Sequence, residues 1–246
     1  IELVGEGRST ATLELIGGQI ALLDALAATG VPMTVVLLAS KPLVLPAAAA
    51  GASLVWAANP GMQGGRAIAE LLLGLIEPRG RLPISFAEHV GQQPTYYNQV
   101  RGQHGDRYAD LTQRPAFAFG EGLSYSTVEY SDLRVDDAEV SLGGAVRATV
   151  VVRNTGPRPA HEIVQVYVRD TVTSVSWADK ELKAYRHVDL APGDEAVVAV
   201  EVPVADLTIV DAAARRVVEP GEFELLVGPS SRDEVLLSAG FRVIAH

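Results

Sequence analysis

The chain has 246 residues, of which 48% are hydrophobic and 20% are charged, a composition that can form a well-packed core. It contains no cysteine, so it can form neither a disulfide nor a zinc–thiolate site and has no thiol nucleophile. The formal net charge of −10 argues against a nucleic-acid partner, and no stretch is long and apolar enough to imply a membrane-spanning segment.

The chain opens at Ile1, inside the short apolar run Ile1–Val4, which is typical of a strand that is already under way. We therefore expect the chain to be a fragment or a processed product of a longer protein. The absence of cysteine suits a cytoplasmic protein and a periplasmic or secreted bacterial protein equally well, so the location stays open.

Residues 1–88 alternate strand patterns with helix patterns. Apolar residues at helical spacing predict helices over Gln19–Ala28, Leu45–Ala50 and Gly64–Ile76. Continuous apolar runs predict strands over Thr34–Ala39 and Ser53–Ala58, each buried on both faces, and a further strand over Leu82–Phe86. This order favours a partial doubly wound parallel sheet with helices on both faces. Because few strands are evident, we expect another chain or segment to complete the sheet.

Residues 128–246 follow a different pattern, with short strands separated by turns rich in Gly, Pro, Asn and Asp. The predicted strands are Arg147–Arg153, Ile163–Arg169, Ala196–Val202, Phe223–Val227 and Glu234–Leu237. Such spacing is typical of an all-β sandwich. Residues 89–127 join the two halves. Their aromatic side chains are expected to pack this linker against both domains. These are Tyr96, Tyr97, Tyr108, Phe117, Phe119 and Tyr125.

Several phrases occur in a fixed order along the chain. They are Gly61–Gly65 (GMQGG), Gly80–Phe86 (GRLPISF), Gly91–Asn98 (GQQPTYYN) and Phe117–Tyr125 (FAFGEGLSY). Together they resemble the C-terminal half of family 3 glycoside hydrolases, the β-glucosidase and β-xylosidase group. Two later phrases, Lys180–Tyr185 and Val218–Phe223, resemble the fibronectin type III-like domain that ends many members of this family.

The resemblance implies a division of the chain into three parts. Residues 1–88 would be the C-terminal part of an α/β sandwich domain, residues 89–127 an ordered linker, and residues 128–246 a fibronectin type III-like β-sandwich. It also implies retaining, exo-acting hydrolysis of terminal β-linked sugars in an oligosaccharide or an aryl or alkyl β-glycoside. No metal or organic cofactor is needed. A homodimer is left open.

By the same resemblance, the nucleophile is an Asp on an upstream barrel, in an N-terminal segment or separate chain, so this chain alone is expected to be inactive. The acid/base Glu is expected in the loop after the strand end Val4-Gly5-Glu6. No acidic residue lies between Glu6 and Glu14, and the interval Gly7–Thr12 is short. The lack of an acidic residue in this interval has three explanations: residues are missing from this sequence, the acid is supplied from elsewhere, or the chain is inactive.

Glu6 itself is a candidate substrate-binding residue, because it matches the Gly-Glu of the family. The alternative is a strand-end glutamate that bonds to nearby backbone groups. Glu14 lies in a strand-like stretch and receives no catalytic role. The turn Asn59–Gly65 follows a predicted strand, so it is expected on the same rim as Glu6, where open α/β sheets bind ligands.

Trp177 is the second candidate substrate-binding residue. It lies in the polar loop Thr171–Asp179, where an indole can stack on a sugar ring or pack in an interface. We expect this loop to be held against the α/β domain, the barrel or a second subunit.

Other chemistries lack their motifs. The five histidines have no metal-ligand spacing, and the chain has no Gly-x-Ser-x-Gly and no complete nucleotide-binding loop. The rival hypothesis from another functional class is a non-catalytic carbohydrate-binding or assembly module. Such a module would keep the fold but have neither an acid/base nor a barrel partner.

Overall fold

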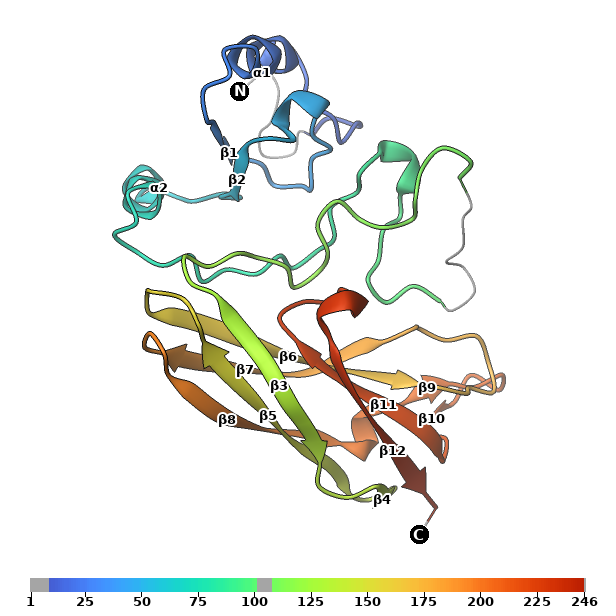
Figure 1. Ribbon diagram of the computed structural model, residues 1–246. Helices are drawn as coiled ribbons and strands as arrows, with labels where there is room; N and C mark the ends of the chain where they lie inside the picture. Colours follow the sequence, from blue (N-terminus) through green and yellow to red (C-terminus); the bar gives the residue numbers. More distant parts are fainter. Residues whose placement is uncertain (1–8, 101–107, 246) are drawn as a thin grey trace. The chain divides into compact units, whose positions relative to one another are not determined.

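The computed structural model describes residues 9–100 and 108–245 (Figure 1). The chain folds into two compact units. The first, called the α/β unit, consists of described residues 9–76 together with Ser85–Thr95 and Arg114–Phe117. The second, called the sandwich unit, consists of Glu77–Ile84, residues 96–100 and 108–113, and residues 118–245.

The α/β unit keeps the predicted order of helices and strands. Its elements are α1 (Gln19–Ala27), β1 (Thr34–Leu37), the 3₁₀ turn Ala47–Ala49, β2 (Ser53–Trp56), α2 (Gly64–Leu72) and the 3₁₀ turn Val90–Gln92. β1 and β2 pair in parallel, from Thr34 opposite Ser53 to Leu37 opposite Trp56, which confirms the predicted parallel sheet. None of the described helices is long and apolar enough to cross a bilayer.

Three predicted elements of this half differ from the structure. Leu82–Phe86 was predicted as a strand and is not one: Phe86 makes an isolated antiparallel bridge with Phe117, and Pro83 has no N–H for a continuous ladder. Leu45–Ala50 shortens to the 3₁₀ turn Ala47–Ala49. The helix Gly64–Ile76 ends four residues early, where Gly74 takes φ +68°.

The prediction that the two parallel strands are buried on both faces is wrong for this chain. Leu37 is the buried residue of β1, and Leu54, Val55 and Trp56 of β2 are half-buried. Trp56 packs edge-on against Phe86, with ring centroids 5.3 Å apart. The apolar runs predict that both strands are fully buried, and the described residues bury them only in part.

The second half is a β-sandwich, as predicted. Its strands are β3 (Val128–Val135), β4 (Glu139–Ser141), β5 (Ala145–Asn154), β6 (Ala160–Asp170), β7 (Glu181–Leu190), β8 (Glu195–Pro203), β9 (Ile209–Val210), β10 (Arg216–Val217), β11 (Gly221–Gly228) and β12 (Leu237–Ile244). In the described chain, one sheet has the order β4-β12-β11-β6-β7 and the other β3-β5-β8, while β9 and β10 form a small hairpin.

One predicted strand of this half is wrong. Glu234–Leu237 was expected to be extended, but Asp233–Val235 forms a 3₁₀ turn and β12 begins at Leu237. Asp233 is held there by ion pairs to Lys180 and Arg169, at 2.7 and 3.1 Å. These partners are distant in sequence, so the local pattern did not reveal the turn.

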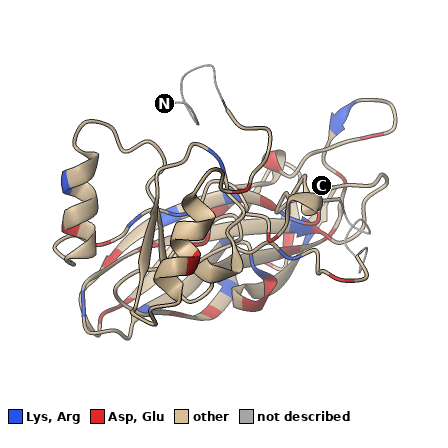
Figure 2. Cartoon of the chain, turned by 90° about the horizontal axis from the view of Figure 1, so that it is seen from above, with Lys and Arg blue, Asp and Glu red and all other residues tan. Residues whose placement is uncertain are grey.

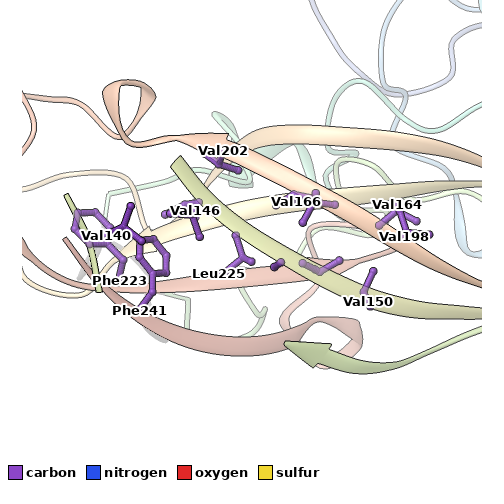
Figure 3. Packing of buried hydrophobic residues seen from close by; sticks show 14 of the residues in the cluster. Val140, Val146, Val150, Val164, Val166, Val198, Val202, Phe223, Leu225 and Phe241 are labelled. Atoms are coloured by element: carbon purple, nitrogen blue, oxygen red, sulfur yellow. The ribbon is translucent and has the colours of Figure 1, made fainter. Parts of the chain in front are cut away.

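Valine alternation builds the core between the two sheets. β5 buries every second residue, including Val146, Val150 and Val152, and β8 contributes Val198 and Val202 from the same sheet (Figure 3). Side chains from the facing sheet complete the core. They are Val164, Val166, Phe223, Leu225 and Phe241. Burying one valine of this kind contributes about 1.5 kcal/mol, so this core supplies much of the stability of the unit.

Part of the linker is fixed to the outside of this sandwich by aromatic packing. Tyr97 stacks on Phe119 with ring centroids 4.2 Å apart, and its edge contacts Tyr167 at 5.8 Å. The Tyr97 hydroxyl accepts a hydrogen bond from the backbone N–H of Leu182 at 3.1 Å. Burial raises the pKa of Tyr167 far above its ordinary value. The predicted packing role of the linker aromatics is confirmed for Tyr97 and Phe119 in the sandwich unit.

Gly120, in the phrase Phe117–Tyr125, has a steric reason to be glycine. Its φ is +78°, and a Cβ there would lie 1.9 Å from the Oε1 of Gln165. The Gln165 amide donates to the carbonyls of Gly120 at 2.8 Å and Pro229 at 2.6 Å, and it accepts from the Tyr167 hydroxyl at 2.5 Å. This part of the phrase therefore packs the linker onto β6.

The phrase that begins at Gly80 supplies a buried charge. The guanidinium of Arg81 contacts Glu162 at 3.1 Å, and the two side chains are only 7% and 5% exposed. The Tyr130 hydroxyl donates to the other oxygen of Glu162 at 2.9 Å. Burial, followed by the charge of Glu162, raises the pKa of Tyr130 far above its ordinary value. This ion pair ties residues 77–84 to strands β3 and β6.

Candidate active-site rim of the α/β unit

The carboxyl ends of β1 and β2 form one rim of the α/β unit, because neighbouring parallel strands end at the same edge. In open α/β sheets, ligands bind outside this edge. The loop after β1 carries Ala39 and Lys41, and the loop after β2 runs through Pro60 to α2. The indole N–H of Trp56 donates to the carbonyl of Ala39 at 2.7 Å, which links the two loops where they leave the strands.

Lys41 connects this rim to the segment that follows Glu6 in the sequence. Its ammonium donates to the hydroxyl of Thr10 at 2.6 Å, to the carbonyl of Thr12 at 2.7 Å, and to the carbonyl of Thr10. An ammonium has three N–H donors, so these contacts satisfy it fully. Residues 10–12 are thereby held against the loop after β1. Glu6 itself lies outside the described residues.

Glu14 is described, and its backbone belongs to an extended segment. It forms an isolated parallel bridge with Val44, whose N–H donates to the carbonyl of Leu13 at 2.8 Å. Its own N–H donates to the hydroxyl of Thr12 at 3.1 Å, and its side chain is exposed. The strand-like position that the sequence indicated for Glu14 agrees with this bridge.

The turn after β2 is shaped by special backbone positions. Ala58 has φ +47° and Gly61 has φ +69°, both in the left-handed region. A Cβ at Gly64 would lie 2.6 Å from the Cβ of Pro60, which explains the glycine that opens α2. Met62 at the tip is fully exposed. The turn therefore lies at the carboxyl end of β2.

Trp177, the other sequence candidate, lies in the sandwich unit between β6 and β7. Its indole N–H donates to a carboxylate oxygen of Glu181 at 3.2 Å. It lines a cavity of about 20 Å³ with Leu207 and Phe223, which is room for roughly one water molecule and not for a sugar ring. Substrate binding by Trp177 stays a prediction.

The loop that carries Trp177 is held within its own unit. Ala178 makes a β-bridge with Val100, and the N–H of Asp179 donates to the carbonyl of Gln99 at 2.8 Å. At the other end, the N–H of Ser174 donates to Glu219 at 2.9 Å. These contacts account for the ordered conformation of the loop. A contact with the α/β domain, the barrel or a second subunit, as the sequence analysis expected, is not needed to explain it.

Sequence reasoning missed a charged network beside this loop. Lys180, whose side chain is 5% exposed, contacts Asp233 at 2.7 Å, and Arg169 contacts Asp179 at 3.0 Å and Glu224 at 2.9 Å. Burial disfavours the charged form of Asp233, but Lys180 and Arg169 outweigh this, so its pKa is lowered. Lys180, the first residue of the phrase Lys180–Tyr185, thus takes part in a polar cluster that supports the fold.

Sequence spacing also missed a histidine pair on β6 and β7. The Nε2 of His161 lies 3.0 Å from the Nδ1 of His187, and the Nδ1 of His161 lies 2.7 Å from a carboxylate oxygen of Asp189. The hydrogen bond from His161 lowers the pKa of Asp189. Across the described part of the chain, no group of three His, Cys, Asp or Glu side chains is placed to hold a metal ion.

Comparison with known proteins gives the rim its context. Residues 2–125 match the model of the Glycosyl hydrolase family 3 C-terminal domain, which is half of the chain. The chain belongs to glycoside hydrolase family 3. Residues 162–231 match the Fibronectin type III-like domain, so the family 3 resemblance and the fold class expected from the sequence are both confirmed.

Curated relatives of this family 3 chain extend well beyond it. A beta-xylosidase of Formosa agariphila is 36% identical over 247 residues, which cover 97% of this chain and 34% of the relative. A periplasmic beta-glucosidase of Salmonella typhimurium is 34% identical, over 92% of this chain and 31% of the relative. The chain therefore spans about a third of the length of the curated relatives it matches.

Solved structures agree with the family 3 fold. A beta-glucosidase involved in saponin metabolism from intestinal bacteria has a TM-score of 0.94 and 55% identity, over 99% of this chain and 35% of that one. The beta-glucosidase of Listeria innocua, in complex with glucose, has a TM-score of 0.89 and 32% identity, over 98% and 35% of the two chains.

Proposed function

We propose that this chain is the C-terminal portion of a retaining, exo-acting β-glycosidase of the β-glucosidase type. The observation that carries the proposal is the family 3 match over residues 2–125, which includes the segment after Glu6 that Lys41 holds at the rim. The substrate class is a terminal β-linked sugar on an oligosaccharide or on an aryl or alkyl group. The names of the relatives, beta-glucosidase and beta-xylosidase, support this class.

The proposed chemistry divides two carboxylates between two parts of the enzyme. An Asp on the upstream barrel attacks the anomeric carbon and forms a glycosyl-enzyme bond, while a carboxylic acid protonates the departing glycosidic oxygen. In the second step the carboxylic acid that gave up its proton, now an ionised carboxylate, takes a proton from water as the water displaces the Asp. The sugar therefore leaves with the configuration that it had in the substrate.

We propose that the acid/base Glu belongs to the loop after Glu6, and that Glu6 itself is a substrate-binding residue. The interval between Glu6 and Glu14 contains no other acidic residue, and the backbone of Glu14 is paired with Val44. Glu6 stands four residues before Thr10, where the contacts of Lys41 begin. The acid is therefore supplied by residues missing from this sequence or by another part of the enzyme, and an inactive chain is the competing outcome.

The need for a partner is supported by the apolar surface of the α/β unit. α1 buries Leu23 but leaves Leu22 and Leu26 60% and 45% exposed, and α2 is followed by Leu73 and Leu75, exposed by 74% and 71%. α1 carries the single charged residue Asp24, and α2 carries the pair Arg66 and Glu70 (Figure 2). Apolar surface of this kind marks an interface, and a two-stranded sheet is marginal alone. We infer that a barrel-containing segment of the same enzyme, with further strands, covers it.

The stereochemical outcome tests the proposed reaction. In the enzyme that joins this chain to its barrel, proton NMR of a reacting β-glycoside should show the β-anomer of the free sugar first, before mutarotation. The α-anomer appearing first would indicate an inverting mechanism and contradict the proposal. The absence of any hydrolysis would favour the non-catalytic carbohydrate-binding or assembly module.

A further inference from the structure

The histidine pair of the sandwich unit lies on the face of β6 and β7 that is turned away from the core, opposite to the buried Val164. His161 lies opposite Asp189 in the β6–β7 pairing, and His187 lies opposite Ile163, so the three polar side chains share one face. The side chain of His161 is only 15% exposed, whereas His187 and Asp189 are exposed. A half-hidden imidazole is therefore held between an exposed imidazole and an exposed carboxylate.

The positions of the hydrogens in this group follow from the carboxylate. The hydrogen bond from His161 lowers the pKa of Asp189, so this side chain stays ionised where histidines titrate. An ionised carboxylate only accepts hydrogen bonds, so the Nδ1 of His161 carries a hydrogen. The Nε2 of a neutral His161 is then an acceptor, and the hydrogen between the two rings belongs to the Nδ1 of His187. His187 therefore donates to His161, and His161 donates to Asp189.

This arrangement accepts one additional proton but not two. The first can bind the Nε2 of His187, which takes part in neither hydrogen bond of the group, and both bonds survive. A second proton would have to bind the Nε2 of His161, where it would face the N–H of His187 across 3.0 Å. Two donors cannot bond to each other, and two like charges at this distance repel. The doubly protonated pair therefore has to separate.

Other groups around the pair do not remove this conflict. Arg79, in residues 77–84, acts on Asp189 as a positive charge, and so it adds to the repulsion. Tyr185 packs edge-on against the ring of His187, with centroids 5.6 Å apart, and carries no charge in this pH range. Glu162 lies on the opposite face of β6, where it is already paired with Arg81. Asp189 thus compensates one positive charge on the pair, and none of the other groups compensates a second.

The pair lies at one end of the β6–β7 pairing, beside its last partners, Ala160 and Leu190. In the described chain β7 is the edge strand of its sheet, and β6 is its partner. We propose that His161, His187 and Asp189 form an acid-sensitive clamp, which holds the end of β7 on β6 while the imidazoles carry at most one added proton and releases it when both are charged. This inference does not rest on the proposed function.

The clamp gives the stability of the sandwich unit a pH dependence of definite sign. In the unfolded chain the two histidines take up protons independently, whereas the folded clamp refuses the second proton. The unfolded state therefore binds more protons in acid, and stability falls as the pH decreases. A difference of one proton changes the unfolding equilibrium constant by up to about 10-fold per pH unit. His187→Gln removes the conflict, because His161 then keeps only its favourable contact with Asp189.

Urea unfolding of the chain in a Trp56→Phe background measures this effect, because Trp177 is then the tryptophan that reports on the sandwich unit. From about pH 8 to about pH 5, the unfolding equilibrium constant should rise at least about 10-fold more with His187 present than in His187→Gln. Tyr185→Phe is the matched control, since it keeps a ring against His187 and changes no charge, and it should follow the parent. The same pH dependence in His187→Gln and the parent would overturn the clamp.

Nuclear magnetic resonance of the chain labelled with ¹⁵N-histidine observes the clamp without a variant. At about pH 8 the nitrogen shifts should show a hydrogen on the Nδ1 of both His161 and His187 and none on either Nε2. At about pH 5 the cross-strand contacts between Ala160 and Leu190 should weaken, while those between Val166 and Ala184 stay. A hydrogen on either Nε2 at the higher pH, or unchanged contacts at the lower pH, would contradict the proposal.

Discussion

Replacing Glu6 by Gln, in the enzyme that joins this chain to its barrel, is expected to lower kcat/KM for a methyl β-glycoside by about 10-fold or more, the usual cost of losing a hydrogen bond to a charged group. The amide keeps the size of the side chain but loses the negative charge that would hold a sugar hydroxyl. Activity on a 2,4-dinitrophenyl glycoside should fall by a similar factor, because a substrate-binding residue acts on the sugar and not on the leaving group. Steady-state kinetics with the two substrates measure both losses.

Azide provides an independent check on Glu6. Because Glu6 is not proposed as the base that activates water, added azide should not accelerate turnover by Glu6→Ala, and azide rescue would instead identify Glu6 as the acid/base. Glu14→Gln is the matched control, because Glu14 is the next acidic residue along the chain and its backbone is paired with Val44. It should retain nearly full activity. Loss of activity in Glu14→Gln with none in Glu6→Gln would reverse the assignment.

Replacing Arg81 by Met is expected to lower the free energy of unfolding of the sandwich unit by about 3–5 kcal/mol, because it leaves the buried carboxylate of Glu162 without its cation. Urea unfolding measures this loss. The chain has one tryptophan in each unit, Trp56 and Trp177. In a Trp56→Phe background, the fluorescence of Trp177 therefore reports on the sandwich unit alone.

The exposed ion pair between Arg147 and Glu201 supplies the control for Arg81. Its atoms are 2.9 Å apart, but the side chains are 58% and 50% exposed, so Arg147→Met should cost less than about 1 kcal/mol. Adding Glu162→Gln to Arg81→Met should recover part of the loss, since the unpaired charge disappears. Similar effects of Arg81→Met and Arg147→Met would contradict a special role for the buried pair.

The sequence predicted the strands in which the pattern of side chains itself shows which face is buried. Alternating valines identified β5 and β8, because one face of each strand meets the core and the other meets water. β7 was missed, since Glu181–Leu190 carries polar side chains on a largely exposed face. Leu82–Phe86 was wrongly predicted as a strand, because an apolar run does not show whether a partner strand exists.

The site was harder to predict than the fold, because its contacts join residues that are distant in sequence. Lys41 lies 31 positions from Thr10, and Arg81 lies 81 positions from Glu162. No local pattern marks either pair. The glycine-rich phrases were recognisable, but the structure gives some of them a packing explanation, as at Gly120 beside Gln165.

The central claim is that this chain completes an active site whose nucleophile is brought by a separate barrel. Hydrolysis of 4-nitrophenyl β-glucoside and β-xyloside tests it most directly, measured for this chain alone, for the barrel-containing segment alone, and for the two together. We predict no turnover above the buffer control for this chain alone and clear turnover when both are present. Turnover by this chain alone, or equal turnover by the barrel segment without it, would contradict the account.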